Sequence, residues 1–342
     1  MIKIKKLISI LLAGAMAFGL CACSDIDDTA DPQQSAGTSV TENVENTGDT
    51  SQSTDTGETG DSVPADWAYE FDSSFIDDNG IGYIWDRLDE DARMNLGEVM
   101  NAIKNVQIYC PLTVGFPRDE AESFLELVSN CSMFYTYASN QFKLHIDENG
   151  IVKGLTINYL INYESEAFAR CEELEAKLQE IISGAPTDSE FNRIRYLHDY
   201  LVLNCDYGED AVSPFSAYGA IVEGIATCQG YADAMHLLLT RAGFETAYAT
   251  GEGNDVTVKH KWNYVKCEDG HWYVIDPTWD DPQNKDDPDY IGYDYLLISD
   301  EMLLRDHAKK YDSIYYDPPV ADSMDMNLSL IHISEPTRLG MI

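Results

Sequence analysis

The sequence GIATCQGYADAMHLLLTRAG at residues 224–243 joins a helical pattern to a cysteine near its start. Its apolar residues recur at three- and four-residue steps, as expected for the buried face of a helix. The residues on this face are Tyr231, Ala234, Met235, Leu238 and Ala242. Thr227 suits the N-cap and Gly243 the end of the helix, which places Cys228 at the first helical position.

The position of Cys228 favours a reactive thiol, because unpaired backbone N–H groups and the positive end of the helix dipole stabilise a thiolate there. A free cysteine can also serve as a small buried apolar residue. Position alone leaves both interpretations open.

A second stretch, VTVKHKWNYVKCEDGHWYVIDPTWDDP at residues 256–282, predicts two strands around a Glu268-Asp269-Gly270 turn. A two-residue loop would place His260 and Asp276 on opposite faces of the hairpin. A three-residue loop with Gly270 in the left-handed region pairs Cys267 with His271 and Trp262 with Asp276. His260 and Asp276 then become diagonal neighbours on one face.

A thiolate at a helix start, a histidine on a strand and a carboxylate on the next strand form the Cys-His-Asp set of acyl-transfer chemistry. This set favours the three-residue loop. The chain resembles the bacterial transglutaminase-like domains in the motifs that carry these residues and in three flanking segments. The motifs are TCQGYADAMHLLLTRAGF, KHKWNYV and GHWYVIDPTWDDP, and the flanking segments are YLHDYLVLNCDY, SAYGAIVEG and YDYLLISDEML.

The resemblance covers about residues 189–319 and implies an α+β fold with a papain-like core. In such a core the nucleophile helix packs on an antiparallel sheet, here preceded by a small α/β accessory region. By the same resemblance, Cys228 is the nucleophile, His260 the general base and acid, and Asp276 the residue that orients the imidazole.

Other side chains compete for roles in this site. The favoured register turns His271 away, and His236 lies two turns from Cys228 along the helix, too far to take its proton. His198 is expected to be a satisfied core or surface histidine. An oxyanion hole would use the backbone N–H of Cys228, with Tyr207 or Tyr218 as candidates for a second donor.

No cofactor or metal is expected. The acidic residues Asp280, Asp281, Asp286, Asp287 and Asp289 lack the spacing of a calcium loop and are predicted to form a solvated loop.

The start of the chain, MIKIKKLISILLAGAMAFGLCAC, has the basic and apolar regions of a signal peptide. Its end resembles the lipobox of bacterial lipoproteins, which implies a signal over residues 1–22 and lipidation of Cys23. An ordinary cleaved signal is the alternative. Residues 23–65 are rich in Asp, Glu, Ser, Thr and Gly and predict a disordered tether. The expected location is the outer face of the bacterial cell membrane, with a lipid anchor at Cys23.

The formal net charge of −38 argues against a nucleic-acid partner. The cysteines outside the signal and the nucleophile position show no spacing of a disulfide framework, and at least one thiol should be free.

The remaining pattern predicts helices over residues 89–105 and 118–131, a hairpin turning at Asn149-Gly150, and two further helices. Thr187 and Glu190 suggest a capping box for the second of these. The predicted domains are an accessory α/β region at 66–164, a catalytic domain at 165–326 and a non-native tail at 327–342. The segment LSLIHISEPTR in this tail can be encoded by DNA that resembles a transposon-end adapter used for sequencing libraries.

The sequence therefore predicts a surface-anchored thiol enzyme that acts on protein or peptide amides, with cell-wall peptide as a candidate substrate. Hydrolysis is favoured over amine transfer, because many bacterial relatives are regarded as hydrolases. The alternatives are a protein-crosslinking transglutaminase and a non-catalytic binding module that keeps the fold.

Overall fold

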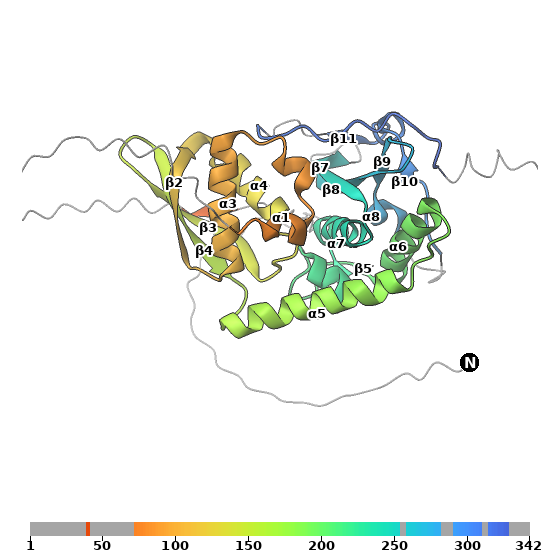
Figure 1. Ribbon diagram of the computed structural model, residues 1–342, viewed down its shortest axis with the longest axis horizontal. Coiled ribbons are helices and arrows are strands. Elements are labelled where there is room, and N and C mark those ends of the chain that lie inside the picture. The colour runs from red at the N-terminus through yellow and green to blue at the C-terminus, as the bar shows by residue number, and fades with distance from the viewer. Residues whose placement is uncertain (1–38, 42–71, 254–257, 282–289, 310–313, 328–342) are drawn as a thin grey trace, which may run out of the picture. The chain divides into compact units, whose positions relative to one another are not determined.

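The chain folds into helices and two larger sheets, as Figure 1 shows for the computed structural model. The structure describes residues 39–41, 72–253, 258–281, 290–309 and 314–327. These described residues fall within one compact unit that spans residues 35–342. The predicted α+β class with antiparallel pairing is confirmed.

The first sheet has four strands in the order β1-β3-β4-β2. Its strands are β1 (Ser39–Thr41), β2 (Tyr109–Pro117), β3 (Ala138–Ile146) and β4 (Ile151–Tyr159). The β3–β4 pair is the predicted hairpin, and Gly150 in its turn has a φ of 77°. β1, which lies within the predicted tether, pairs with β3 in parallel.

Four described helices come from the same N-terminal part of the chain, and the two longest of them contact the first sheet. They are α1 (Ser74–Asn79), α2 (Gly82–Trp85), α3 (Glu90–Lys104) and α4 (Ala121–Cys131), the last preceded by the 3₁₀ turn η1 (Arg118–Glu120). Both long predicted helices are confirmed within a few residues. α3 begins where the Asp89 side chain accepts the Ala92 N–H at 2.8 Å, and it buries Leu96, Val99 and Ile103 completely.

The second sheet has five strands in the order β10-β9-β8-β7-β11. Its strands are β7 (Glu245–Gly253), β8 (Val258–Lys266), β9 (Trp272–Ile275), β10 (Leu296–Ile298) and β11 (His307–Lys309), and all the pairings are antiparallel. The short helices α8 (Pro277–Asp280) and α9 (Asp300–Leu303) lie in the connections.

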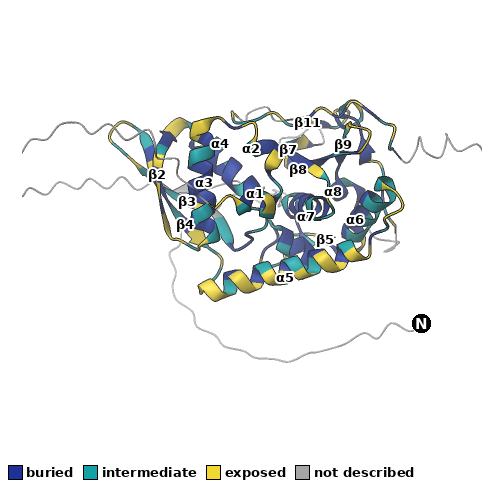
Figure 2. Cartoon of the chain, viewed as in Figure 1, coloured by how far each residue is buried: buried dark blue, intermediate teal, exposed yellow. Residues whose placement is uncertain are grey.

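The central helix α7 (Cys228–Arg241) contacts this sheet on one side and α5 (Glu164–Ser183) and α6 (Glu190–Asn204) on the other. It is buried almost all round, whereas the outer face of α5 is exposed (Figure 2). Four of the five predicted core positions on α7 are fully buried, and Ala242 is partly buried. A small sheet of β5 (Asp206–Tyr207) and β6 (Ile225–Ala226) and the π-helix η2 (Gly219–Glu223) precede α7.

The β8–β9 hairpin has the predicted three-residue loop. Val265 pairs with Tyr273 and Lys266 pairs with Trp272. The same register places Cys267 opposite His271. The Cys267 N–H donates to the His271 carbonyl at 3.0 Å, and Gly270 has a φ of 85°. The register that brings His260 and Asp276 onto one face is therefore confirmed.

Two predicted helix caps differ in the structure. α6 begins after Ser189, whose hydroxyl accepts the Asn192 N–H at 3.2 Å, so the capping box at Thr187 is wrong. Thr227 does occupy the N-cap of α7, but its side chain makes no cap hydrogen bond. The Thr227 hydroxyl instead donates to the Pro214 carbonyl at 3.4 Å, which ties the start of α7 to the preceding loop.

Several predictions fall outside the described residues: the signal at 1–22, Cys23, all but residues 39–41 of the tether, and the tail beyond residue 327. None of the described helices has the length and apolar character needed to span a bilayer. All six cysteines from Cys110 to Cys267 are free thiols.

Candidate active site

Cys228 opens α7 and is partly exposed, unlike most of the helix that follows it. Its sulfur lies 4.0 Å from the Lys259 carbonyl oxygen, next to His260 on β8. Gly230 lets the first turn of α7 pack against the preceding loop, because a Cβ at this position would lie 2.8 Å from the carbonyl oxygens of both Pro214 and Ser216. The sequence therefore presses the first turn of α7 against the loop that precedes it.

His260 is buried on β8, and its Nε2 lies 2.6 Å from Asp276 Oδ2. With Nε2 bonded to the carboxylate, Nδ1 is the ring nitrogen left for its other side-chain partner, Cys228. Burial alone would lower the pKa of His260, but the Asp276 carboxylate and the Cys228 sulfur outweigh it and raise the pKa to about 10. The imidazolium form is thus strongly favoured between these two partners.

Asp276 is fully buried at the end of β9 and is the N-cap of α8. Its Oδ1 accepts the N–H groups of Thr278 at 3.1 Å and Trp279 at 3.3 Å, which leaves Oδ2 for His260. Burial would raise the pKa of this carboxyl group, but His260 and then His307 hold it well below its usual range. The carboxylate is therefore ionised and fixed at both oxygens.

Two contacts fix β8 against α7. Lys261 and Asp233 form a buried ion pair, and Asn263 Nδ2 donates to the Ala232 carbonyl at 3.0 Å. Because both partners lie on the first turns of α7, these contacts set the position of the strand relative to Cys228. The Trp262 ring stacks on His260 with ring centroids 5.9 Å apart.

Sequence reasoning missed His307, on β11, which is buried beside the same carboxylate. His307 Nε2 lies 3.3 Å from Asp276 Oδ2, and the ring centroids of His307 and His260 are 5.3 Å apart. No spacing in the sequence signals this contact, because His307 lies 31 positions beyond Asp276 and reaches it only through sheet topology.

The three histidines that were considered as competitors make other contacts. His271 is exposed and pairs with Asp322 at 2.9 Å, and buried His236 hydrogen-bonds the Gly80 carbonyl at 3.0 Å. His198 is a satisfied core residue whose two nitrogens each lie 3.1 Å from a carboxylate, that of Asp199 or Asp280.

The prediction of a solvated acidic loop is wrong for Asp280 and Asp281, which are 2% and 4% exposed. Asp280 bonds His198 and the Tyr295 N–H, and Asp281 accepts the Tyr231 hydroxyl at 2.5 Å. The sequence does not reveal this burial, because His198 and Tyr231 lie on helices that are distant in the chain. The other three aspartates lie outside the described residues.

The two tyrosines considered as oxyanion donors have different surroundings. Tyr218 donates its hydroxyl to Glu173 at 2.5 Å on α5. Burial, and then the charge of Cys228, raise the pKa of Tyr207 to about 12. Tyr207 is therefore kept as the candidate for a second donor.

Among the described residues, one group has the composition of a metal site: His260, Asp276 and His307, with ligand atoms within 4.8 Å of one another. Two ligands of a tetrahedral zinc ion lie roughly 3.3 Å apart, given metal–ligand bonds of about 2.0 Å. The 2.6 Å between His260 Nε2 and Asp276 Oδ2 is a direct hydrogen bond instead. The arrangement fits a proton-handling site better than an ion-binding one.

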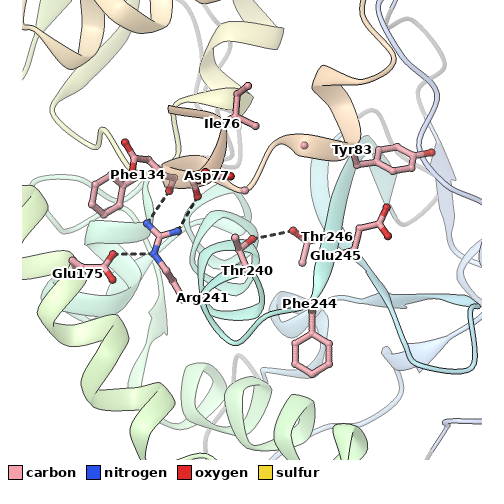
Figure 3. Close-up of a pocket in the computed structure, with 13 residues that line it drawn as sticks. Ile76, Asp77, Tyr83, Phe134, Glu175, Thr240, Arg241, Phe244, Glu245 and Thr246 are labelled. Atoms are coloured by element: carbon pink, nitrogen blue, oxygen red, sulfur yellow. Dashed lines mark hydrogen bonds and ion pairs between the residues drawn. The ribbon is translucent and has the colours of Figure 1, made fainter. Parts of the chain in front are cut away.

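A pocket of about 350 Å³ is lined in part by the first turns of α7, although Cys228 itself does not line it. One wall comes from the accessory region and includes Tyr135, Ser139 and Leu160, and the other includes Phe215 and Gln229, the residue after Cys228. A larger cavity, of about 690 Å³, lies at the opposite end of α7 around Arg241 (Figure 3). Arg241 is committed there to the Glu175 carboxylate and two backbone carbonyls of α1.

One comparison with known proteins identifies a family over part of the chain. Residues 175–277 match the transglutaminase-like superfamily, so the chain contains a transglutaminase-like domain over that segment. A search of curated proteins found no match.

Three solved structures are similar over part of the chain. A TGase shares 15% identity, with 43% of this chain and 46% of that chain covered and a TM-score of 0.30. A candidate cysteine protease from Cytophaga hutchinsonii shares 13%, with 46% and 55% covered and a TM-score of 0.29. The periplasmic domain of TgpA from Pseudomonas aeruginosa, bound to ethylmercury, shares 17%, with 32% and 44% covered and a TM-score of 0.25. The chain spans about half the length of each.

Proposed function

We propose that the chain is a thiol enzyme that hydrolyses protein or peptide amides through Cys228, His260 and Asp276. The observation that carries the proposal is the chain of contacts from the Cys228 sulfur through the His260 ring to the ionised Asp276 carboxylate. A buried imidazole held between a thiol and a carboxylate has the geometry that nucleophilic acyl chemistry requires.

In this mechanism the Cys228 sulfur attacks the amide carbonyl carbon, and the C–N bond breaks as His260 gives its proton to the leaving amine. A water molecule then gives a proton to His260 and attacks the thioester, which releases the acid and restores the Cys228 thiolate beside the His260 imidazolium. The backbone N–H of Cys228 has no intrahelical partner in the first turn of α7 and is one donor for the oxyanion. The partial exposure of Cys228 lets water reach the thioester and supports hydrolysis.

The deciding experiment is a product profile of the purified chain. A labelled casein would report peptide cleavage, released ammonia would report side-chain deamidation, and a biotinylated alkyl amine would report transfer to amines. Hydrolysis without amine incorporation is expected. Predominant amine incorporation would make the protein a crosslinking transglutaminase, and no turnover with an unreactive Cys228 would make it a binding module.

The proposed location follows from the first residues of the chain. We infer a signal over residues 1–22 and a lipid anchor at Cys23, which would hold the enzyme at the outer face of the bacterial cell membrane near peptide amides of the wall. Metabolic labelling with an alkyne fatty acid tests this inference. The native chain should take up label and Cys23→Ser should not, whereas equal labelling of both would contradict the anchor.

A further inference from the structure

His307 lies at the edge of the second sheet, outside the segment that matches the superfamily, yet it contacts the centre of the candidate site. It is the first residue of β11, where it pairs with Gly253 of β7. The side chain is completely buried. A buried histidine at this place needs a physical reason, because its ring nitrogens must be satisfied away from water.

Both ring nitrogens of His307 face carboxylates. Nδ1 lies 2.7 Å from Asp306 Oδ1, and Nε2 lies 3.3 Å from Asp276 Oδ2. The Nε2 contact falls outside the geometry of a hydrogen bond, so it is close and electrostatic in the resting site. The ring is held by Trp279, with ring centroids 4.1 Å apart, and by Tyr295 at 5.4 Å. These contacts fix the imidazole edge toward Asp276.

We propose that His307 is a positioning residue that keeps the Asp276 carboxylate ionised and oriented while the charge of His260 changes during turnover. The proposal rests on the proposed thiol mechanism. In that mechanism His260 loses its proton to the leaving amine, which removes the positive charge beside a carboxylate buried in a low dielectric. His307 takes no part in the proton transfer. In this proposal its ring keeps Nδ1–H toward Asp306 and Nε2–H toward Asp276, and so its positive charge stays beside Asp276 until water attacks the thioester.

The titratable groups that act on Asp276 come from four elements. They are His260 on β8, His307 on β11, Asp280 on α8 and Tyr295 next to β10. The two histidines stabilise the ionised carboxylate, and Asp280 opposes it. Loss of His307 therefore makes Asp276 easier to protonate, and turnover that needs the carboxylate should fail at a higher pH than in the native protein.

The test compares His307→Leu, which removes the ring nitrogens, with His307→Gln, which keeps an N–H donor. In the full chain, His307→Leu should lower kcat by about tenfold or more, as loss of an outer hydrogen-bond partner does at metal-bound histidines. KM should change little, and the acidic limb of the kcat profile should move to higher pH. His307→Gln should recover much of the loss. Native kcat and native acidic limb in His307→Leu would overturn the proposal, as would equal losses in both variants.

A second measurement uses protein that keeps His307, so it does not depend on whether the His307 variants fold. In Cys228→Ala protein labelled with ¹⁵N-histidine, the Nε2 resonance of His307 should be that of a protonated nitrogen and should shift when Asp276→Asn is added. An unprotonated, insensitive Nε2 would overturn the proposal. This readout does not need turnover, so it stays informative even if Cys228 proves unreactive and the proposed function fails.

Discussion

His260 meets Asp276 through Nε2, over 2.6 Å, and this choice of nitrogen turns Nδ1 toward the thiol. Asp276→Asn should break the pairing, because its amide oxygen can still accept from Thr278 and Trp279 while its NH₂ group faces the ring. Turnover is expected to fall by about 10²- to 10⁴-fold, and the protein should lose some stability, because the buried His260 imidazolium loses its charged partner. Steady-state kinetics of casein cleavage measure the loss. Asp322→Asn, which alters the partner of exposed His271, is the matched control and should retain native turnover.

Cys228 should react with iodoacetamide at about pH 7 much faster than the buried thiols. Burial raises the pKa of Cys110, Cys131 and Cys171 to about 12, so these groups stay protonated. Cys228→Ala should abolish turnover while leaving the fold intact, and His260→Ala should slow the labelling of Cys228. Mass spectrometry of timed labelling gives the rates. Labelling of Cys228 no faster than that of Cys267, and indifferent to His260, would show that the thiol is structural.

Tyr207→Phe should reduce kcat by about tenfold or more if its hydroxyl donates to the oxyanion, since loss of one such donor costs roughly 10²-fold or more in known cases. The side chain is 40% exposed, so removal of the hydroxyl should barely change stability. Tyr218→Phe is the control, because its hydroxyl is bonded to Glu173. Equal kcat for the two variants would assign the second donor elsewhere.

The contribution of His260 to the stability of the folded protein should depend on pH. Its pKa rises from 6.5 to about 10 in the folded protein, so the folded state binds this proton more tightly than the unfolded chain does. The resulting stabilisation is complete below about pH 6.5 and is lost as the pH rises through about 10. Urea unfolding of native protein and His260→Gln should therefore give a difference in unfolding free energy that shrinks between about pH 6 and pH 10.5. A difference that grows with pH would contradict the raised pKa of His260.

Gly251→Ala should damage the sheet beside the site. A Cβ at this position would lie 2.1 Å from the Ala308 carbonyl oxygen and 2.6 Å from the Trp262 ring, so β11 must move away from β7. We expect a loss of about 1–3 kcal/mol in unfolding free energy, measured by urea denaturation, together with lower turnover. Gly82→Ala, where a Cβ meets nothing within 4 Å, should leave both unchanged.

The sequence predicts the parts of this site that depend on local pattern. The helix that begins at Cys228 follows from its apolar period, which is a short-range property. The turn at Gly270 allowed two hairpin registers, and the Cys-His-Asp set favoured the one that the structure has. The triad residues could be proposed together because each lies on or beside such a local element.

The parts that sequence reasoning missed depend on long-range contacts. His307 meets Asp276 only because β11 pairs with β7 across the sheet. Asp280 and Asp281 looked solvated because their partners, His198 and Tyr231, lie on other helices. The cap at Ser189 was misplaced by two residues, since two hydroxyl residues there suit the same role.

The position of β11 in the chain also bears on when the site can form. The ribosome makes Cys228, His260 and Asp276 well before His307, and the strand that encloses their carboxylate is among the last described elements to be synthesised. A nascent chain therefore holds the three residues before this enclosure is complete. The order of synthesis delays full enclosure of the Asp276 carboxylate until β11 has been made.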